Sequence, residues 1–309
     1  MRCVIERSTT DGQHAPRVTV FAPAKLNLSL QVLGRRPDGY HDLESLMVTL
    51  DLYDELRFTP APPGRGLTLH CRNLAPAAAP PQPLPPVDDR NLVCRAAQLL
   101  AAETGCPLDV TIELHKRIPL EAGLAGGSAD AAATLFGLTR LWNLPLSDHQ
   151  LRALGARLGS DISFFLAHAP AAICTGRGEV VEPVPVPTGL AFVVAKPPSG
   201  LSTPRVFQHC RPEPGVTRAR ALAAELRAGR LTQAARLLVN TLQPAAELLN
   251  PDVCRLRHLF ESLPFLGHQM SGSGTSYFGL CRNVTQARAL AARVAAAGRD
   301  RVCVARLAG

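Results

Sequence analysis

Three short stretches of the chain combine residue types that bind phosphate or move protons. Residues 119–132 read Pro-Leu-Glu-Ala-Gly-Leu-Ala-Gly-Gly-Ser-Ala-Asp-Ala-Ala, with a strand pattern before them and an apolar helical pattern after them. Small residues let a ligand approach the backbone, and the first turn of a helix carries unpaired N–H donors at its positive end. The stretch therefore predicts a phosphate loop, with a close-packed glycine turn as the alternative. The spacings of the P-loop and of the Rossmann motif are absent.

The second stretch, residues 270–276, reads Met-Ser-Gly-Ser-Gly-Thr-Ser and precedes an apolar strand pattern. Alone it is weak evidence, because ordinary turns have the same composition. Together with the first loop it indicates a second wall of one phosphate site.

The third stretch contains Lys25 and Asn27 within Ala-Pro-Ala-Lys-Leu-Asn-Leu. Residues two apart in a strand point to the same face, so we expect these two side chains to lie together. Lys25 is suited to neutralising phosphate charge. The alternative is a solvated surface lysine, but the surrounding apolar strand pattern favours the functional interpretation.

The elements that position these stretches follow from periodicity and turn residues. The chain opens with antiparallel strands that a turn at residues 35–39 separates, and Ser147 is placed to cap a helix. We expect strands at 18–20, 26–33, 41–50, 55–58, 110–114, 171–174, 190–195, 276–281 and 302–307, and helices at 91–102, 129–142, 147–158, 218–227, 231–239, 252–262 and 285–297.

These elements predict an α+β protein with two domains, residues 17–170 and 171–309. Residues 1–16 are polar and predict a flexible leader. Residues 75–87 are rich in proline, which blocks helices and sheet ladders, so they predict a surface spur within the first domain.

The composition narrows the class of protein. The chain has 309 residues and a net charge of +8, and only Lys25, Lys116 and Lys196 among its 33 basic residues are lysines. The arginines are scattered and aromatic residues make up 5%, which argues against nucleic acid. Most of the arginines are expected to be solvated surface residues, and attraction of an anionic small molecule is the weaker functional interpretation. The nine cysteines lack metal spacing, and we find neither a secretory signal nor a membrane span, so we expect a cytoplasmic protein without membrane or nucleic-acid partners.

The three stretches resemble those of the GHMP kinases, named for galactokinase, homoserine kinase, mevalonate kinase and phosphomevalonate kinase. Residues 23–28 (Pro-Ala-Lys-Leu-Asn-Leu), 36–43 (Arg-Pro-Asp-Gly-Tyr-His-Asp-Leu) and 158–162 (Leu-Gly-Ser-Asp-Ile) further resemble the 4-diphosphocytidyl-2-C-methyl-D-erythritol kinases of the non-mevalonate isoprenoid pathway. The Asp-Gly-Tyr-His element discriminates best, because the whole superfamily shares the glycine motifs. The likeness runs from about residue 18 to near the C-terminus.

The resemblance implies an N-terminal half like domain 2 of ribosomal protein S5 and a ferredoxin-like C-terminal half. It also implies transfer of the ATP γ-phosphate, assisted by Mg²⁺, to the 2-hydroxyl of a cytidine diphosphate conjugate. Lys25 and Asp161 fall on the catalytic lysine and aspartate of the family, and we expect a monomer or a weak homodimer. The ATP-phosphate loop corresponds to Pro119, Leu120, Glu121, Ala122, Gly123, Leu124, Ala125, Gly126, Gly127, Ser128 and Ala129.

The resemblance also implies a substrate site. Tyr40 falls on a residue that stacks on cytosine, His41 on one that hydrogen-bonds it, and Phe207 near an aromatic that stacks on the other ring face. Asn27 lies on the substrate-facing strand, and the second glycine loop adds Gly272, Ser273 and Gly274.

Two departures and two rival functions remain. Ala125 replaces a family glycine, which matters little unless its φ is positive. Ser160-Asp161-Ile162-Ser163 stands where relatives often carry Ala-Asp-Val-Pro.

One rival function is a GHMP kinase for homoserine or mevalonate, and the other is a non-catalytic nucleotide- or RNA-binding module.

Overall fold

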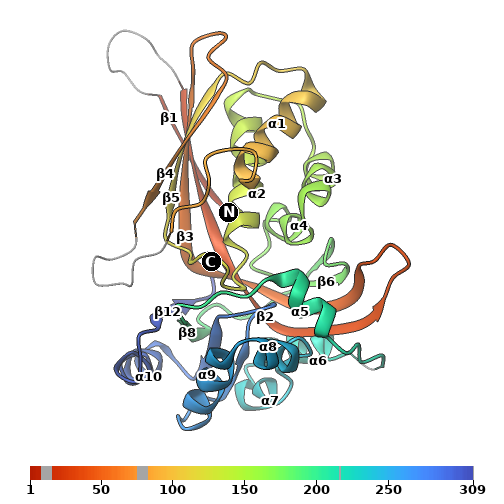
Figure 1. The fold of residues 1–309 in the computed structure, drawn as a ribbon, viewed down its shortest axis with the longest axis vertical. Helices are drawn as coiled ribbons and strands as arrows, with labels where there is room; N and C mark the ends of the chain where they lie inside the picture. Colours follow the sequence, from red (N-terminus) through yellow and green to blue (C-terminus); the bar gives the residue numbers. More distant parts are fainter. Residues whose placement is uncertain (8–15, 75–82, 216, 309) are drawn as a thin grey trace.

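A computed structural model of the chain describes residues 1–7, 16–74, 83–215 and 217–308. Figure 1 shows an elongated molecule in which a sheet with its helices forms the upper part and a second sheet with its helices forms the lower part. None of the helices within the described ranges has the length and apolar character needed to cross a membrane.

The first sheet follows the order β1-β2-β3-β5-β4, with β6 added to β3, β7 added to β6 and β9 added to β2. Its pairs are antiparallel except β4–β5 and β2–β9. Its strands are β1 (Arg2–Arg7), β2 (Pro16–Arg35), β3 (His41–Pro60), β4 (Leu67–Asn73), β5 (Val110–Lys116), β6 (Ala171–Gly176), β7 (Val180–Pro183) and β9 (Val239–Asn240).

Four helices pack beside the upper part of this sheet (Figure 1). Asn91 caps α1 and Ser147 caps α3 through a capping box with Gln150, which confirms the predicted role of Ser147. These helices are α1 (Leu92–Thr104), α2 (Gly126–Leu141), α3 (Asp148–Leu158) and α4 (Ser160–Leu166).

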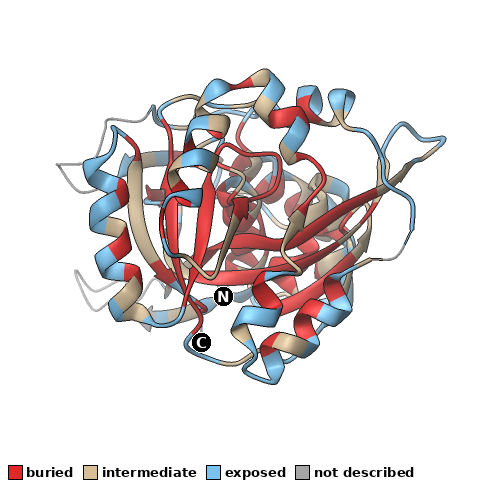
Figure 2. Ribbon diagram, turned by 90° about the horizontal axis from the view of Figure 1, so that it is seen from below, coloured by how far each residue is buried: buried red, intermediate tan, exposed pale blue. Residues whose placement is uncertain are grey.

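The second sheet is antiparallel with the order β10-β11-β8-β12, and its two inner strands, β8 and β11, are buried along their whole length. Figure 2 shows buried strands inside the molecule and helices whose outer faces are exposed. Its strands are β8 (Ala191–Lys196), β10 (Gly267–Met270), β11 (Tyr277–Cys281) and β12 (Arg301–Arg306). The helices of this half are α5 (Thr203–His209), α6 (Ala219–Arg227), α7 (Leu231–Ala235), α8 (Gln243–Leu249), α9 (Pro251–Glu261) and α10 (Val284–Ala296).

The long strand β2 joins the two halves. Its alternating apolar side chains belong to the upper core as far as Ala22, to a second core from Ala24 to Leu28, and to a third core at Leu30 and Val32. The pairing of β2 with β3 shifts register between Pro23 and Lys25. Such irregularities bend a strand, and this one places Lys25 at the junction of the halves.

The domain limits need two corrections. Residues 2–7 of the expected flexible leader form β1, which pairs with β2, and residues 8–15 lie outside the described ranges. The first sheet also continues beyond residue 170, because β6 pairs with β3 and β7 pairs with β6. Of the proline-rich spur, residues 75–82 lie outside the described ranges and residues 83–87 form neither helix nor strand.

Several elements were not expected from periodicity. The strands β4, β7, β9 and β10 and the helices α4 and α8 are short, and short elements carry weak periodic signals. Helix α7 ends at Ala235, four residues before the expected end, because the chain then turns to pair β9 with β2.

Candidate active site

A cavity of about 1460 Å³ has walls from both halves of the chain. Six basic residues line it against two acidic ones, so it favours an anionic ligand. The basic residues are Lys25, Arg35, Arg177, Lys196, Arg299 and Arg301, and the acidic residues are Glu121 and Asp161.

Lys25 and Asp161 meet in this cavity. The Lys25 Nζ lies 3.8 Å from the Asp161 Oδ2, and the lysine side chain is 4% exposed while that of Asp161 is 31% exposed. Lys25 also donates a hydrogen bond to the side-chain Oδ1 of Asn27, so the predicted shared strand face is confirmed. Gly159 is the N-cap of α4 and provides no side-chain cap, and Asp161 in the first turn of this helix pairs with the lysine.

Asn27 is fully buried, and both ends of its amide have protein partners. Its oxygen accepts from Lys25 and its nitrogen donates to the Ser45 Oγ at 2.7 Å. In this structure Asn27 therefore orients the lysine, and contact of Asn27 with substrate stays a prediction.

The two glycine loops lie against each other, as the sequence predicted. The Ser271 Oγ donates to the Gly123 carbonyl at 3.1 Å, and the Ser276 amide donates to the Ala122 carbonyl at 3.1 Å. A Cβ on Gly272 would lie 3.3 Å from the Lys25 Nζ. The second loop therefore packs over the lysine and closes that side of the site.

The predicted phosphate loop alternates its backbone conformation. Glu121, Gly123 and Ala125 have φ values of 48°, 69° and 54°, whereas Ala122 and Leu124 are not in the left-handed region. Such alternation gathers successive N–H groups into a concave nest that binds anions, and here it leads into the N-terminus of α2. Ala125 thus has the positive φ at which alanine is less favourable than the glycine found in relatives.

Not every residue of the predicted phosphate loop, residues 119–129, faces the cavity. The side chains of Leu124 and Ala129 are buried in the hydrophobic cores and do not line the cavity. Ala125 is the N-cap of α2, so Ser128 does not cap this helix and its hydroxyl lies at the cavity.

A buried cluster of three charged residues lies beneath this loop. Lys116, the last residue of β5, donates to Asp54 of β3 and to the Asp130 Oδ2 of α2 at 2.6 Å. The Asp54 Oδ1 also accepts from the amides of Arg117 at 2.5 Å and Ile118 at 2.9 Å. The cluster thus holds both the entry to the loop and the helix at its exit.

The charges of this cluster influence one another strongly. Burial alone would lower the pKa of Lys116, but the two carboxylates raise that pKa above its ordinary value. Burial raises the pKa of Asp130, and its Oδ1 has no hydrogen-bond partner among the described residues. A protonated Asp130 leaves one cation and one anion in the cluster, which is the favourable charge state for a dry site.

The other end of the cavity carries aromatic side chains. The rings of His41 and Phe207 have centroids 5.3 Å apart, and Tyr40 precedes His41 at the end of a turn in which Gly39 has a φ of 86°. Tyr40 is 54% exposed, so one ring face is available to a ligand. Burial lowers the pKa of His41, and neighbouring Arg35 lowers it further, which favours the neutral imidazole.

The structure brings the other predicted residues to the same cavity. Gly272, Ser273 and Gly274 line it, and Ser273 hydrogen-bonds Thr203 of α5, the helix that carries Phe207. Among the described histidines, only His41 lines the cavity. No cluster of three or more His, Cys, Asp or Glu suited to a metal occurs among the described residues.

Sequence reasoning missed some residues of the site. Asp54 and Arg177 come from segments without a motif, and residues 83–86 of the proline-rich stretch line the cavity. The scarcity of lysine was the one signal in the sequence that could have pointed to further site residues, because all three lysines are buried at or beneath the site. Lys196 donates to the carbonyls of Pro197 and Ser199, and burial lowers its pKa.

The chain matches known protein families along most of its length. The model of the GHMP kinases N terminal domain matches residues 91–171, and that of the GHMP kinases C terminal domain matches residues 222–300. Proteins named 4-diphosphocytidyl-2-C-methyl-D-erythritol kinase are similar to it. The one from Pelotomaculum thermopropionicum is 40% identical over 89% of this chain and 93% of its own. The one from Geobacillus thermodenitrificans is 39% identical over 85% and 88%.

Solved structures share the fold. A crystal structure of 4-(cytidine 5'-diphospho)-2C-methyl-D-erythritol kinase superposes with a TM-score of 0.77 at 34% identity, covering 94% of this chain and all of that one. Homoserine kinase from Cytophaga hutchinsonii has a TM-score of 0.70 at 19% identity, covering 99% and 98% of the two chains, and is alike in fold alone.

Proposed function

Since the chain belongs to the GHMP kinases and, within them, to the 4-diphosphocytidyl-2-C-methyl-D-erythritol kinase family, we propose that it phosphorylates the 2-hydroxyl of 4-diphosphocytidyl-2-C-methyl-D-erythritol with ATP. It is an ATP-dependent small-molecule kinase by family. One observation carries the choice of substrate: the Lys25–Asp161 pair and the aromatic end with Tyr40, His41 and Phe207 line a single cavity. This reaction belongs to the non-mevalonate route to isoprenoids.

In this proposal Asp161 accepts the proton of the reacting hydroxyl and Lys25 neutralises charge on the transferring phosphoryl group. Phosphoryl transfer has a loose transition state, so correct placement and fixed charges provide most of the catalysis. Asn27 and the Gly272 backbone confine the ammonium group, and Ser45 in turn fixes Asn27. The Lys25 ammonium group is therefore already oriented before the substrates bind.

ATP binds with its phosphates on the nest formed by the loop from Glu121 to Ala125 and on the N-terminus of α2. Mg²⁺ suits this site, because that ion takes oxygen ligands from substrate phosphates and one or two side chains rather than from a protein cage. Among the side chains that line the cavity, Ser128, Glu121 and Asp161 would offer such oxygen ligands. When bound, the ion supplies charge neutralisation at the phosphates.

The cytosine end follows from the aromatic residues. Tyr40 and Phe207 stack on the base, and neutral His41 offers a hydrogen bond to it. The nine cysteines lie within the described ranges and none forms a disulfide, which suits a reducing cytoplasm.

Coupled measurement of ADP release tests the function. We expect turnover with the diphosphocytidyl substrate and none with mevalonate or homoserine at equal concentration. Turnover with mevalonate or homoserine instead would replace the substrate assignment. ATP binding without ADP release from any of the three alcohols would favour the non-catalytic module.

A further inference from the structure

The proposed substrate carries a diphosphate between its cytosine end and its reacting hydroxyl, and the charge of that group needs a partner. This inference rests on the proposed function. The aromatic residues and the Lys25–Asp161 pair line one cavity, so with the base at the former and the hydroxyl at the latter, a residue that binds the diphosphate would lie on the wall between them.

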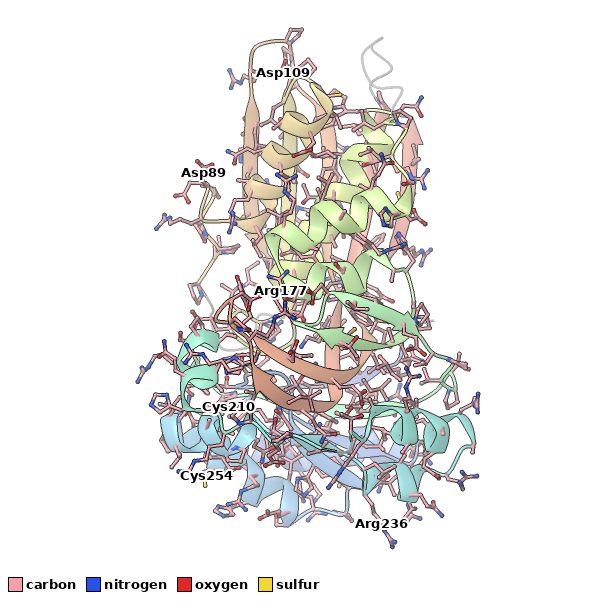
Figure 3. All side chains as sticks on the ribbon, turned by 90° about the vertical axis from the view of Figure 1, so that its right-hand side faces the viewer. Asp89, Asp109, Arg177, Cys210, Arg236 and Cys254 are labelled. Carbon is pink, nitrogen blue, oxygen red and sulfur yellow. The ribbon has the colours of Figure 1, made fainter. Side chains whose placement is uncertain are left out.

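Arg177 lies on that wall. It occupies the tight turn between β6 and β7, where Gly176 and Gly178 have φ values of 69° and 110°. Its guanidinium carbon lies 4.7 Å from the centre of the Tyr40 ring. On its other side, a Cβ on Gly178 would lie 3.5 Å from the Cβ of Ser160, the residue before Asp161. Figure 3 shows Arg177 where the upper and lower halves meet.

The Arg177 guanidinium is oriented by one hydrogen bond, and its other donors are free, within the described ranges, to bind a ligand. The backbone amide of Arg177 donates to the Glu179 Oε2 at 2.6 Å, and its Nε donates to the Glu179 Oε1 at 3.2 Å. Its Nη1 and Nη2 atoms have no acceptor among the described residues, and the side chain is 26% exposed. Glu179 thus fixes the direction of the planar group, while two nitrogens face a ligand in the fork geometry that matches phosphate.

Four of the other five cations of the cavity are placed for different contacts, and the fifth, Arg299, lies exposed between α10 and β12, two residues before Arg301. Lys25 pairs with Asp161, and the Lys196 Nζ is held by two backbone carbonyls. Arg301 donates to the carbonyl of Arg117 at 2.6 Å, near the entry to the phosphate loop. Arg35 pairs with His41 across the strands and is set beside the base rather than beside Ser160.

We propose that Arg177 binds the diphosphate of the cytidine substrate and at the same time covers one face of Tyr40, so that the base stacks on the other face. The cation–π contact stiffens an otherwise exposed ring. The residue would therefore favour cytidine diphosphate conjugates over ligands that carry the base alone.

Competition assays with cytidine, CMP and CDP against the diphosphocytidyl substrate test this assignment. In Arg177→Ala we expect the inhibition constant of CDP to rise ~10- to 100-fold, as for loss of a charge-assisted hydrogen bond. That of cytidine should rise less than ~5-fold, as for loss of an exposed cation–π contact, and the KM for ATP should stay unchanged. Arg177→Lys should recover part of the CDP binding, whereas Arg177→Gln, of similar length, should not.

The matched control is Arg157→Ala, because Arg157 is also an ion-paired arginine but lies on α3 and pairs with Glu103 away from the cavity. Equal weakening of cytidine and CDP, or no change for CDP, would overturn the diphosphate contact. Failure of the wild-type protein to turn over the diphosphocytidyl substrate would instead refute the proposed function. Wild-type turnover with unaltered CDP binding in all three Arg177 variants would refute this inference alone.

Discussion

The two ends of the cavity differ in how deeply their residues are buried and in which elements carry them. At the end where we propose phosphoryl transfer, Lys25 and Lys116 are almost wholly buried and both lie on strands of the first sheet. At the aromatic end, where we propose that the base binds (the base end), Tyr40 lies half exposed beside a turn, and Arg177 occupies another turn.

This difference has an electrostatic origin. Fixed charges act most strongly where water is excluded, but burying them destabilises the fold unless partners surround them. Lys116 meets that condition through Asp54 and Asp130. A stacking aromatic needs an open face instead, so it can stand on a turn with little cost to stability. Substitutions at the first end should therefore affect turnover or folding, and those at the second end should affect substrate binding.

The largest effect is expected from Asp161→Asn. Loss of the proton acceptor should lower kcat by ~10²- to 10⁴-fold, the usual contribution of a general base. The KM for both substrates should change little, because the side chain keeps its size. Steady-state kinetics with purified protein measure this, and turnover within a few-fold of wild type would rule out the assigned role.

Lys116→Met should be the most destabilising change near the site. It leaves Asp54 and Asp130 buried without their cation, which costs about 3–5 kcal/mol of unfolding free energy. Urea denaturation of the variant against wild type measures the loss. Asp130→Asn is the control and should be nearly neutral, since burial already raises the pKa of Asp130. A stable Lys116→Met protein would show that the cluster does not support the loop.

Tyr40→Ala tests the base end. Stacking on an aromatic contributes about 1–3 kcal/mol per base, so the KM for the cytidine substrate should rise ~5- to 150-fold. The KM for ATP and the melting temperature should stay close to wild type, because the ring is largely exposed. Parallel changes in both KM values would contradict the separation of the two ends.

The smallest effect is expected at Ala125. Its left-handed backbone disfavours any side chain, although glycine also gains freedom in the unfolded chain. Ala125→Gly should therefore raise the unfolding free energy by only about 0.5–1 kcal/mol, which thermal or urea unfolding detects. A destabilised variant would mean that the Ala125 methyl group contributes more by packing than its backbone strain removes.

Much of the fold could be predicted where the signal is local. The period-two pattern placed Lys25 and Asn27 on one face, and Ser147 marked the start of a helix. The leader was the clearest error. Residues 1–16 taken together are polar enough to suggest disorder, yet residues 2–7 form β1 because the edge of β2 offers unpaired backbone groups.

The sequence by itself determined the family and the two glycine loops, and it pointed to Lys25 and Asp161 as the proposed catalytic pair, because these depend on short patterns of residue type. Only the tertiary structure decided that Lys116 joins Asp54 and Asp130, and that Arg177 covers Tyr40. Those partners lie 14 to 137 positions apart in the chain. Contacts over such separations arise from sheet register and the packing of the halves, which leave no periodic trace in the sequence.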